Sequence, residues 1–157
     1  MTTPAAKYQV VLRDVVEADL AVFFEHQRDP EANRMASFPA RDHDAFTAHW
    51  NKILADETLT TQAILVDGEV AGNIVSWVQD GDALIGYWIG RDFWGRGIAT
   101  QALARFCELL DARPLLAHVA KDNIGSVRVL EKCGFTVTDE HVGSDGVAEL
   151  TMRLDSR

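Results

Sequence analysis

Apolar and polar residues along the chain recur with two different periods, one typical of strands and one typical of helices. The two-residue period and short apolar runs predict strands over residues 8–15, 61–66, 70–78, 83–89, 114–119, 135–142 and 147–153. The helical period predicts helices from residue 16 to the Asp29-Pro30 pair, after Asp42, and over residues 98–110 and 124–133, and residues 35–40 are expected to be irregular. Some strands are joined by hairpins and others by helices, which indicates a mixed sheet with helices on both faces.

The length and composition are those of one globular domain. The 157 residues suit a single core, and neither repeats nor a linker divides them, so we expect one domain over residues 1–157. No run of about 18 apolar residues suggests a membrane span, and the N-terminus lacks the apolar centre of a signal peptide. Cys107 and Cys133 are isolated and lack metal-ligand spacing, so we expect reduced thiols, a cytoplasmic location and no metal.

The charge of the chain limits the possible partners. The formal net charge is −9, which argues against a nucleic-acid partner and weakly favours a cationic or neutral one. Five basic side chains nevertheless gather in the sequence near two motifs that could bind an anion: Arg91, Arg96, Lys121, Arg128 and Lys132. Local positive charge is therefore available in a chain that is acidic overall.

The most informative segment is a glycine-rich turn between the strand that ends at Ile89 and the helix that begins near residue 98. Gly95 and Gly97 leave the backbone N–H groups accessible, and the first turn of a helix has N–H groups without partners. Together they form an anion site that suits a phosphate or pyrophosphate. The turn is not a P-loop, because no Gly-Lys-Ser/Thr follows, and Thr100 stands where a dinucleotide fingerprint needs its third glycine. A plain tight turn is the alternative interpretation.

A second motif lies downstream and favours the anion site over the plain tight turn. It reads Asn123-Ile-Gly-Ser126, then a short helix, then Lys132-Cys-Gly134-Phe135. Asp122 or Asn123 can cap this helix, and Gly134 supplies its left-handed end. The two motifs together resemble the two signatures of the GNAT N-acetyltransferase superfamily over roughly residues 64–135. Trp94 stands where most members have Gln or Arg, as in the branch resembling ribosomal-protein N-terminal (alanine/serine) acetyltransferases.

The resemblance implies a fold, a donor and a donor site. The fold is α/β (α+β), with a mixed, mostly antiparallel sheet of about six or seven strands, a splay between strands 4 and 5, and about four helices. The donor is acetyl-CoA, whose acetyl group passes directly to an amine. Its pyrophosphate would take N–H groups from Arg96 to Gln101, and its pantetheine would pair with the backbone of residues 87–89 in the splay. The implied donor-binding residues are Tyr87, Trp88, Ile89, Trp94, Gly95, Arg96, Gly97, Ile98, Ala99, Thr100, Asn123, Ser126 and Lys132.

The resemblance also implies where protons move. Many members use a Tyr seven residues after the motif's Asn as the acid, but Leu130 occupies that position here. Ser126 is the expected substitute, and Asn123 would hold the region of the departing sulfur. For the base, the candidates on or between the last two strands are Asp139, Glu140, His141, Asp145 and Glu149. Asp145 and His141 are favoured among them. A Ser126 that bonds only its own helix backbone is the alternative.

The expected acceptor is a primary amine, either a small molecule or a peptide N-terminus. Trp50, Trp77 and His43 are expected to line its pocket, although aromatic residues at such spacings more often form core. The alternative function is a non-catalytic acyl-CoA-binding sensor or interaction module, which the missing Tyr at position 130 keeps open. We expect a monomer or a homodimer.

Overall fold

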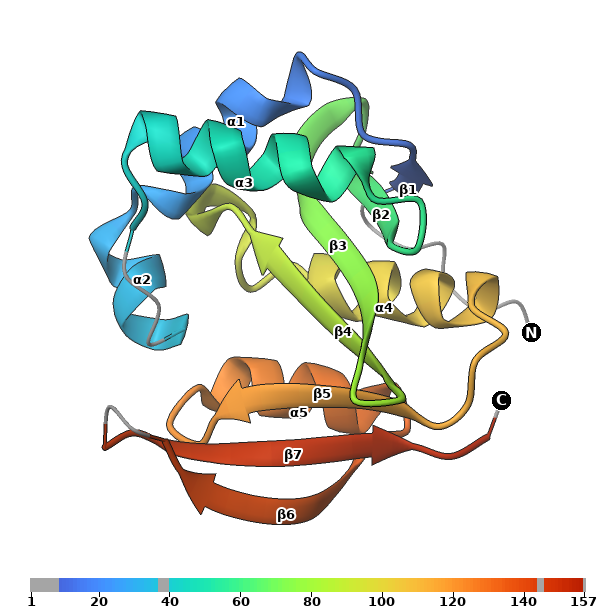
Figure 1. Cartoon of the computed structure of the whole chain (residues 1–157). Helices are drawn as coiled ribbons and strands as arrows, with labels where there is room; N and C mark the ends of the chain where they lie inside the picture. Colours follow the sequence, from blue (N-terminus) through green and yellow to red (C-terminus); the bar gives the residue numbers. More distant parts are fainter. Residues whose placement is uncertain (1–8, 37–39, 144–145, 157) are drawn as a thin grey trace, which may run out of the picture.

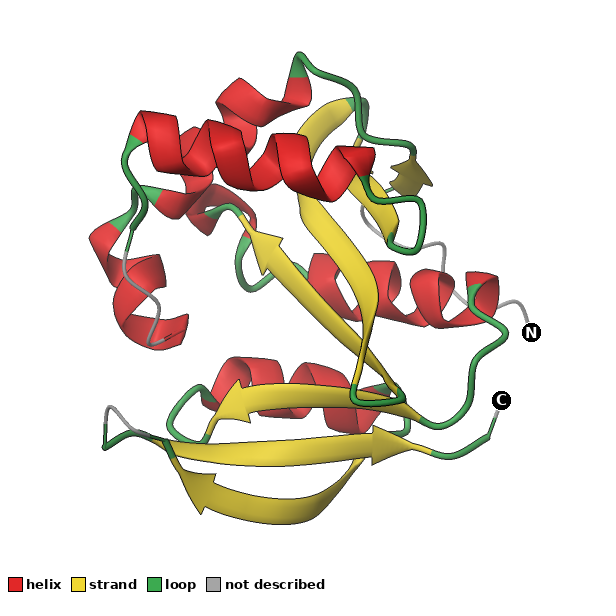
Figure 2. Cartoon of the chain, in the orientation of Figure 1, coloured by secondary structure: helices red, strands yellow, loops and turns green. Residues whose placement is uncertain are grey.

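The computed structural model describes residues 9–36, 40–143 and 146–156. Its seven strands form one sheet, in the order β1-β2-β3-β4-β5-β7-β6. The strands are β1 (Val10–Arg13), β2 (Thr60–Val66), β3 (Glu69–Gln79), β4 (Asp82–Ile89), β5 (Leu115–Ala120), β6 (Thr136–Val142) and β7 (Ala148–Leu154). Figures 1 and 2 show that α1 and α3 cover one face of β2–β4, whereas α4 covers the opposite face. The expected mixed α/β sheet with helices on both faces is confirmed.

Hairpins build the first half of the sheet as the sequence predicts. The turn between β2 and β3 has both central residues at positive φ, 50° at Asp67 and 86° at Gly68, and the turn between β3 and β4 repeats this at Asp80 and Gly81. Such turns match the right-handed twist of the strands that they join. The strands β2, β3 and β4 therefore form an antiparallel meander, and β1, which is joined to β2 through helices, pairs antiparallel with β2.

The helices number five in the described residues, rather than about four. They are α1 (Asp19–Gln27), α2 (Pro30–Ala36), α3 (His43–Ala55), α4 (Ile98–Leu109) and α5 (Ile124–Lys132), and a short 3₁₀ helix, η1, spans Arg91–Phe93. The Asp29-Pro30 pair was expected only to end a helix, and residues 35–40 were expected to be irregular, whereas α2 extends to Ala36. Proline also suits the first position of a new helix, and the Asp29 carboxylate accepts a hydrogen bond from the Glu31 N–H at 2.9 Å. The helix α2 follows from these two features.

The sheet opens between its fourth and fifth strands. β4 and β5 are parallel and pair at only two positions, Ala83 with Leu115 and Leu84 with Leu116. Beyond these pairs the two strands diverge, and a wide gap separates their ends in Figure 1. The expected splay between strands 4 and 5 is therefore confirmed, and it leaves one edge of β4 without a strand partner from Ile85 onward.

Two clusters of buried side chains hold the sheet and helices together. One lies between the sheet and α4, where Leu103 and Phe106 are fully buried. The other lies under α1 and α3 and contains Phe23, Phe46 and Trp50. Each buried aromatic side chain contributes on the order of 2–3 kcal/mol, so both faces of β3 and β4 are fixed near the splay.

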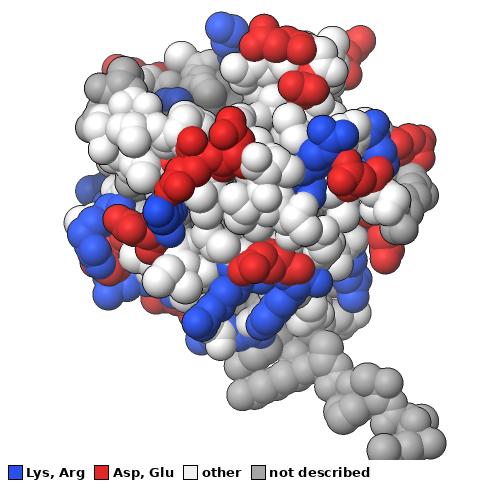
Figure 3. Space-filling model, turned by 90° about the horizontal axis from the view of Figure 1, so that it is seen from below, with Lys and Arg blue, Asp and Glu red and all other residues white. Residues whose placement is uncertain are grey.

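The surface charge, the helix lengths and the placement of possible metal ligands relate to the expected partners. Figure 3 shows acidic and basic side chains interspersed on the face seen from below. None of the described helices combines the length and apolar character needed to cross a bilayer. Within the described ranges, no three His, Cys, Asp or Glu side chains gather closely enough to hold a metal ion.

Candidate functional site

The glycine turn presents backbone N–H groups to solvent, as the sequence predicts. Gly95 and Gly97 have φ of 75° and 74°, values that favour glycine, and a Cβ at either position would meet nothing within 4 Å. Gly97 caps α4 without a side-chain hydrogen bond. The Gln101 N–H donates to the Gly97 carbonyl at 3.2 Å. This N–H is therefore already bonded within the helix, although it was expected to bind the pyrophosphate. The cradle therefore consists of the N–H groups before it, chiefly those of residues 98–100.

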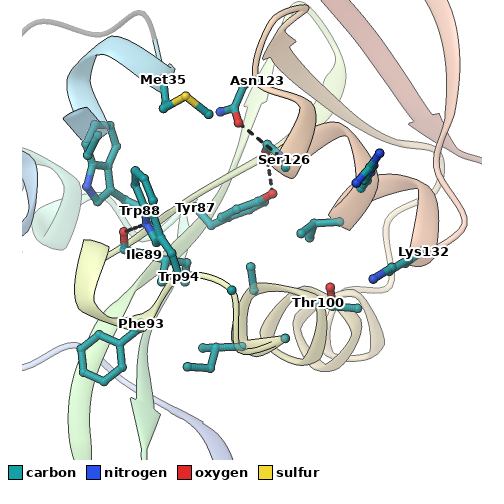
Figure 4. Close-up of a pocket in the computed structure, with 18 residues that line it drawn as sticks. Met35, Tyr87, Trp88, Ile89, Phe93, Trp94, Thr100, Asn123, Ser126 and Lys132 are labelled. Atoms are coloured by element: carbon teal, nitrogen blue, oxygen red, sulfur yellow. Dashed lines mark hydrogen bonds between the residues drawn. The ribbon is translucent and has the colours of Figure 1, made fainter.

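Trp94 anchors this turn to the end of β4. Its indole Nε1–H donates to the Ile89 carbonyl at 2.9 Å, a bond drawn in Figure 4. The indole thus spans five residues of chain and holds the glycine turn close to the splay. This contact gives a physical role to the residue that departs from the usual Gln or Arg.

The free edge of β4 presents backbone groups in the splay. The Gly90 N–H donates to the Ala71 carbonyl on β3, and bonding direction alternates from one residue to the next along a strand. The N–H and C=O groups of Tyr87 and Ile89 therefore point away from β3, toward the splay. Because the Trp94 indole takes the Ile89 carbonyl, the Tyr87 groups and the Ile89 N–H are the ones that an extended ligand would meet.

The Tyr87 hydroxyl lies across the splay from α5 and reaches Ser126. Its Oη is 2.6 Å from the Ser126 Oγ, and Figure 4 shows the two side chains pointing toward each other. Burial raises the pKa of Tyr87 to about 12, although its hydrogen bond with Ser126 lowers it in part. The phenol therefore stays protonated at neutral pH, so it can donate a proton but cannot serve as a base.

Asn123 positions Ser126 from within the same helix. The Asn123 Oδ1 accepts a hydrogen bond from the Ser126 N–H at 3.3 Å, which makes Asn123 the N-cap of α5. At position 130, where many similar proteins have a Tyr, Leu130 is 1% exposed and packs in the core. The hydroxyl groups available at this point are thus those of Tyr87 and Ser126.

A cleft of about 450 Å³ connects these parts, a size typical of small-ligand sites. Of the expected donor-binding residues, all but Arg96 line it: Tyr87, Trp88, Ile89, Trp94, Gly95, Gly97, Ile98, Ala99, Thr100, Asn123, Ser126 and Lys132. The Arg96 guanidinium instead lies 5.8 Å from the centroid of the Phe93 ring. Of the five basic residues near the motifs, Arg128 and Lys132 line the cleft, whereas Lys121 pairs with Glu140 and Arg91 with Asp29.

Sequence reasoning missed the part of the cleft that comes from α2. Ala32 and Met35 line it, and Figure 4 shows Met35 facing Asn123 across the opening. The signal that could have found them is the Pro30 start of a short helix. Phe93, Gly125 and Val129 also line the cleft and belong to segments that the motifs already marked.

A second cavity, of about 650 Å³, lies under α3 on the other face of the sheet. Two residues, Tyr87 and Trp88, line both cavities, so the end of β4 separates them. Trp50 and Trp77 line this second cavity as candidate acceptor residues, together with Asn73 and His49. His43, the third candidate, lines neither cavity: its side chain is 74% exposed and its ring packs edge-on against Phe24.

The candidate bases are only partly described. Asp145 lies outside the described residues. His141 is on β6, and its Nε2 is 3.2 Å from the Glu149 carboxylate on β7, but neither residue lines the two cavities. His49 does line the second cavity, and burial together with Arg41 and Lys52 lowers its pKa. Its imidazole is therefore neutral at neutral pH.

The strand splay, the glycine turn at a helix N-terminus and the capped second helix define a class of acyl-CoA-binding transferase. The family model described as "Acetyltransferase (GNAT) domain" matches residues 9–136. The chain belongs to this family, and the expectation of an acetyl-CoA-dependent N-acetyltransferase is confirmed. No curated relative matches the chain at a significant level.

Several solved structures share the fold. The aminoglycoside acetyltransferase AAC(6')-Ib in complex with coenzyme A has a TM-score of 0.79 and 22% identity, over 94% of this chain and 95% of that chain. Spermidine N-acetyltransferase from Vibrio cholerae, in complex with CoA and spermine, has a TM-score of 0.81 and 18% identity, with the same coverage of 94% and 95%. An acetyltransferase of the GNAT family from Bacillus anthracis has a TM-score of 0.82 and 15% identity, over 96% and 97%. At these identities the likeness establishes the fold.

Proposed function

We propose that the protein moves the acetyl group of acetyl-CoA directly to a primary amine, with no covalent acyl-enzyme. The observation that carries this proposal is the Tyr87–Ser126 hydrogen bond of 2.6 Å, which lies beside the glycine turn and the open edge of β4. It brings a proton donor, an anion cradle and free backbone groups into one cleft. Direct transfer needs these groups and an amine, and it needs no nucleophilic side chain.

In this proposal the residues of the cleft have separate roles in binding acetyl-CoA and in moving protons. The N–H groups at the start of α4 hold the pyrophosphate, with Arg128 and Lys132 adding positive charge from α5. The backbone of Tyr87 and Ile89 aligns the pantetheine, and a backbone N–H there stabilises the oxyanion that forms when the amine attacks the thioester carbon. When the carbon–sulfur bond breaks, Ser126 gives its proton to the leaving thiolate and the Tyr87 hydroxyl supplies Ser126 in turn. A proton from water then restores Tyr87, which balances the proton that the amine gives up.

The acceptor amine loses one proton as the new bond forms. His49 is the basic side chain that lines the second cavity with a lowered pKa, and its neutral imidazole can take this proton directly or through water. Asp145 stays a prediction from the sequence, since it lies outside the described residues. His141 and Glu149 form a pair on the exposed strands β6 and β7.

Two sources of amine remain compatible with the site. Trp94 and Ser126 resemble the branch of ribosomal-protein N-terminal acetyltransferases, which is compatible with a peptide N-terminus but does not fix the substrate. Other proteins of this fold are bound to kanamycin or spermine, which favours a small molecule. Thiol release from acetyl-CoA, measured with free amines and with N-terminal peptides, separates the two.

The same assay tests catalysis itself. Thiol release that depends on the amine and on both Tyr87 and Ser126 supports direct transfer. Tight binding of acetyl-CoA without turnover across a broad panel of amines and peptides would contradict the proposal and favour the sensor. A burst of thiol without amine would point to an acyl-enzyme instead.

A further inference from the structure

The side chains that line the second cavity limit the ligands that it can hold, and they do not suit a polycation. Three tryptophans surround it, Trp50, Trp77 and Trp88. Trp50 is 5% exposed, and its ring is fixed by contacts with Phe23 and Phe46 at centroid distances of 5.0 and 6.4 Å. A rigid aromatic wall of this kind favours a flat or apolar ligand body.

The other two indole rings are held by polar contacts that leave their carbon surfaces to the cavity. The Trp77 Nε1–H donates to Gln79, and the Trp88 Nε1–H donates to the His26 carbonyl, each at 3.4 Å. The Trp77 ring lies over Gly86, where an added Cβ would come within 3.3 Å of it. The absence of a side chain at Gly86 therefore lets the indole lie close to β4.

The charges in the cavity are few. Among its described lining residues, Asp56 is the one carboxylate and Arg41 the one guanidinium, and the lowered pKa of His49 keeps its ring neutral. The Asp56 Oδ1 already accepts two hydrogen bonds from Thr58. The Thr58 N–H donates at 2.9 Å and the Thr58 Oγ1 donates at 2.6 Å. A ligand with several ammonium groups would leave most of them without a partner, which is costly in a partly buried site.

One polar group inside the cavity is available to orient a ligand. Asn73 lies on β3 opposite Trp88 on β4 and lines the cavity, and its side-chain amide can both donate and accept hydrogen bonds. Trp88 and its neighbour Tyr87 also line the first cleft, so Asn73 lies on the part of β3 that pairs with the boundary between the two cavities.

We infer that the acceptor held by this cavity is a primary amine on an aromatic or aliphatic body, without a second cationic group. The inference rests on the proposed acetyl transfer. The apolar body lies among the three indoles, and the single amine lies near Tyr87 and Trp88, where the two cavities meet. A polycation such as spermine or kanamycin fits this lining poorly, although such molecules are bound by proteins of the same fold.

The test compares 2-phenylethylamine with spermine and kanamycin, both in turnover and in calorimetric titration of the full chain loaded with CoA. We expect a kcat/KM for 2-phenylethylamine at least about tenfold above that for either polycation. Trp77→Ala should raise the KM for 2-phenylethylamine about tenfold and leave the affinity for CoA unchanged. An equal or reversed preference, or a KM unaffected by Trp77→Ala, overturns the inference while leaving acetyl transfer intact.

A charge variant provides the reverse test. Asn73→Asp adds a carboxylate to the cavity with almost no change of shape, so it should raise the kcat/KM for spermine relative to 2-phenylethylamine about tenfold. Asn51→Asp makes the same chemical change on the exposed side of α3 and should leave the ratio unchanged. If no amine is acetylated but 2-phenylethylamine still binds in the titration and loses affinity in Trp77→Ala, the cavity is assigned correctly and the proposed transfer is wrong. Absence of monoamine binding in the titration overturns the inference.

Discussion

The Tyr87 Oη lies 2.6 Å from the Ser126 Oγ, although the two residues are 39 positions apart in the chain. The bond joins the open end of β4 to the first turn of α5, so it bridges the splay in which the donor is proposed to lie. This one contact thus helps to hold β4 and α5 together, and in the proposed mechanism it also supplies a proton. Removing it shows how much it contributes to stability and how much to catalysis.

Tyr87→Phe tests this pair. The change removes one hydroxyl from a half-buried position, so we expect kcat to fall by about 10- to 100-fold while the affinity for CoA changes little. The free energy of unfolding should fall by only about 1 kcal/mol. Steady-state kinetics and denaturant unfolding measure the two quantities. A purely structural bond would lower stability and leave kcat unchanged.

Ser126→Ala and the double variant extend the same measurement. If the two hydroxyl groups act as one unit, each single variant removes most of the effect, and the double variant is no slower than the slower single variant. Losses in kcat that multiply in the double variant would instead mean that the two side chains act independently.

Gly97→Asp tests the anion cradle. A carboxylate at the N-cap of α4 would repel the pyrophosphate, so we expect the Kd for CoA to rise at least about tenfold, with partial recovery at high salt. Gly97→Asn is the matched control, because Asn tolerates the φ of 74° as well as Asp does and carries no charge. Calorimetry at two salt concentrations provides the comparison. Equal losses in the two variants would assign the effect to bulk rather than to charge.

His26 makes stability depend on pH. Its ring packs against Gly90 directly after β4, its Nδ1 is buried without a hydrogen-bond partner among the described residues, and burial lowers its pKa below the usual 6.5. The unfolded chain therefore binds this proton more readily than the folded one. Stability is complete above about pH 6.5 and falls as the pH drops below that value.

We expect His26→Gln to reduce the loss of unfolding free energy between about pH 7.5 and pH 5.5 by about 1 kcal/mol. His49 has a lowered pKa as well, so part of the slope should remain. His43→Gln is the control, because the His43 side chain is exposed, and its slope should match that of the parent protein. Urea unfolding at the two pH values gives the answer, and identical slopes in the parent and His26→Gln would refute the assignment.

Gly72→Ala tests how closely β3 approaches β4 beside the donor site. An added Cβ would lie 2.1 Å from the Trp88 carbonyl oxygen, a backbone atom that cannot move aside without shifting the strand. We expect a loss of about 3 kcal/mol in the free energy of unfolding and weaker binding of CoA at the displaced residues 88 and 89. Gly125→Ala, where a Cβ meets nothing within 4 Å on the helix α5, should instead keep or slightly raise the melting temperature. A Gly72→Ala variant as stable as the parent would show that the sheet yields at this point.

The elements could be predicted from the sequence because their signals are local. Hydrophobic periods marked all seven strands and four of the five helices, and the glycines at positions 95 and 97 marked the anion cradle. Asp122 or Asn123 was expected as the cap of the second helix, and Asn123 caps α5. The helix α2 was missed because a proline can both end one helix and start the next, and seven residues give little periodic signal.

The sequence by itself thus determined the turn, the cap and the helix N-terminus of the proposed donor site, since each of these is made within about ten residues of chain. Only the tertiary structure decided that the Tyr87 side chain meets Ser126, that Trp94 bonds the end of β4, and that Met35 lines the cleft. It also decided the lining of the second cavity, which brings Trp50 of α3 together with Asn73 and Trp77 of β3. Such contacts depend on strand register and on the packing of helices that are distant in the sequence. A local sequence pattern therefore does not predict which residues will meet.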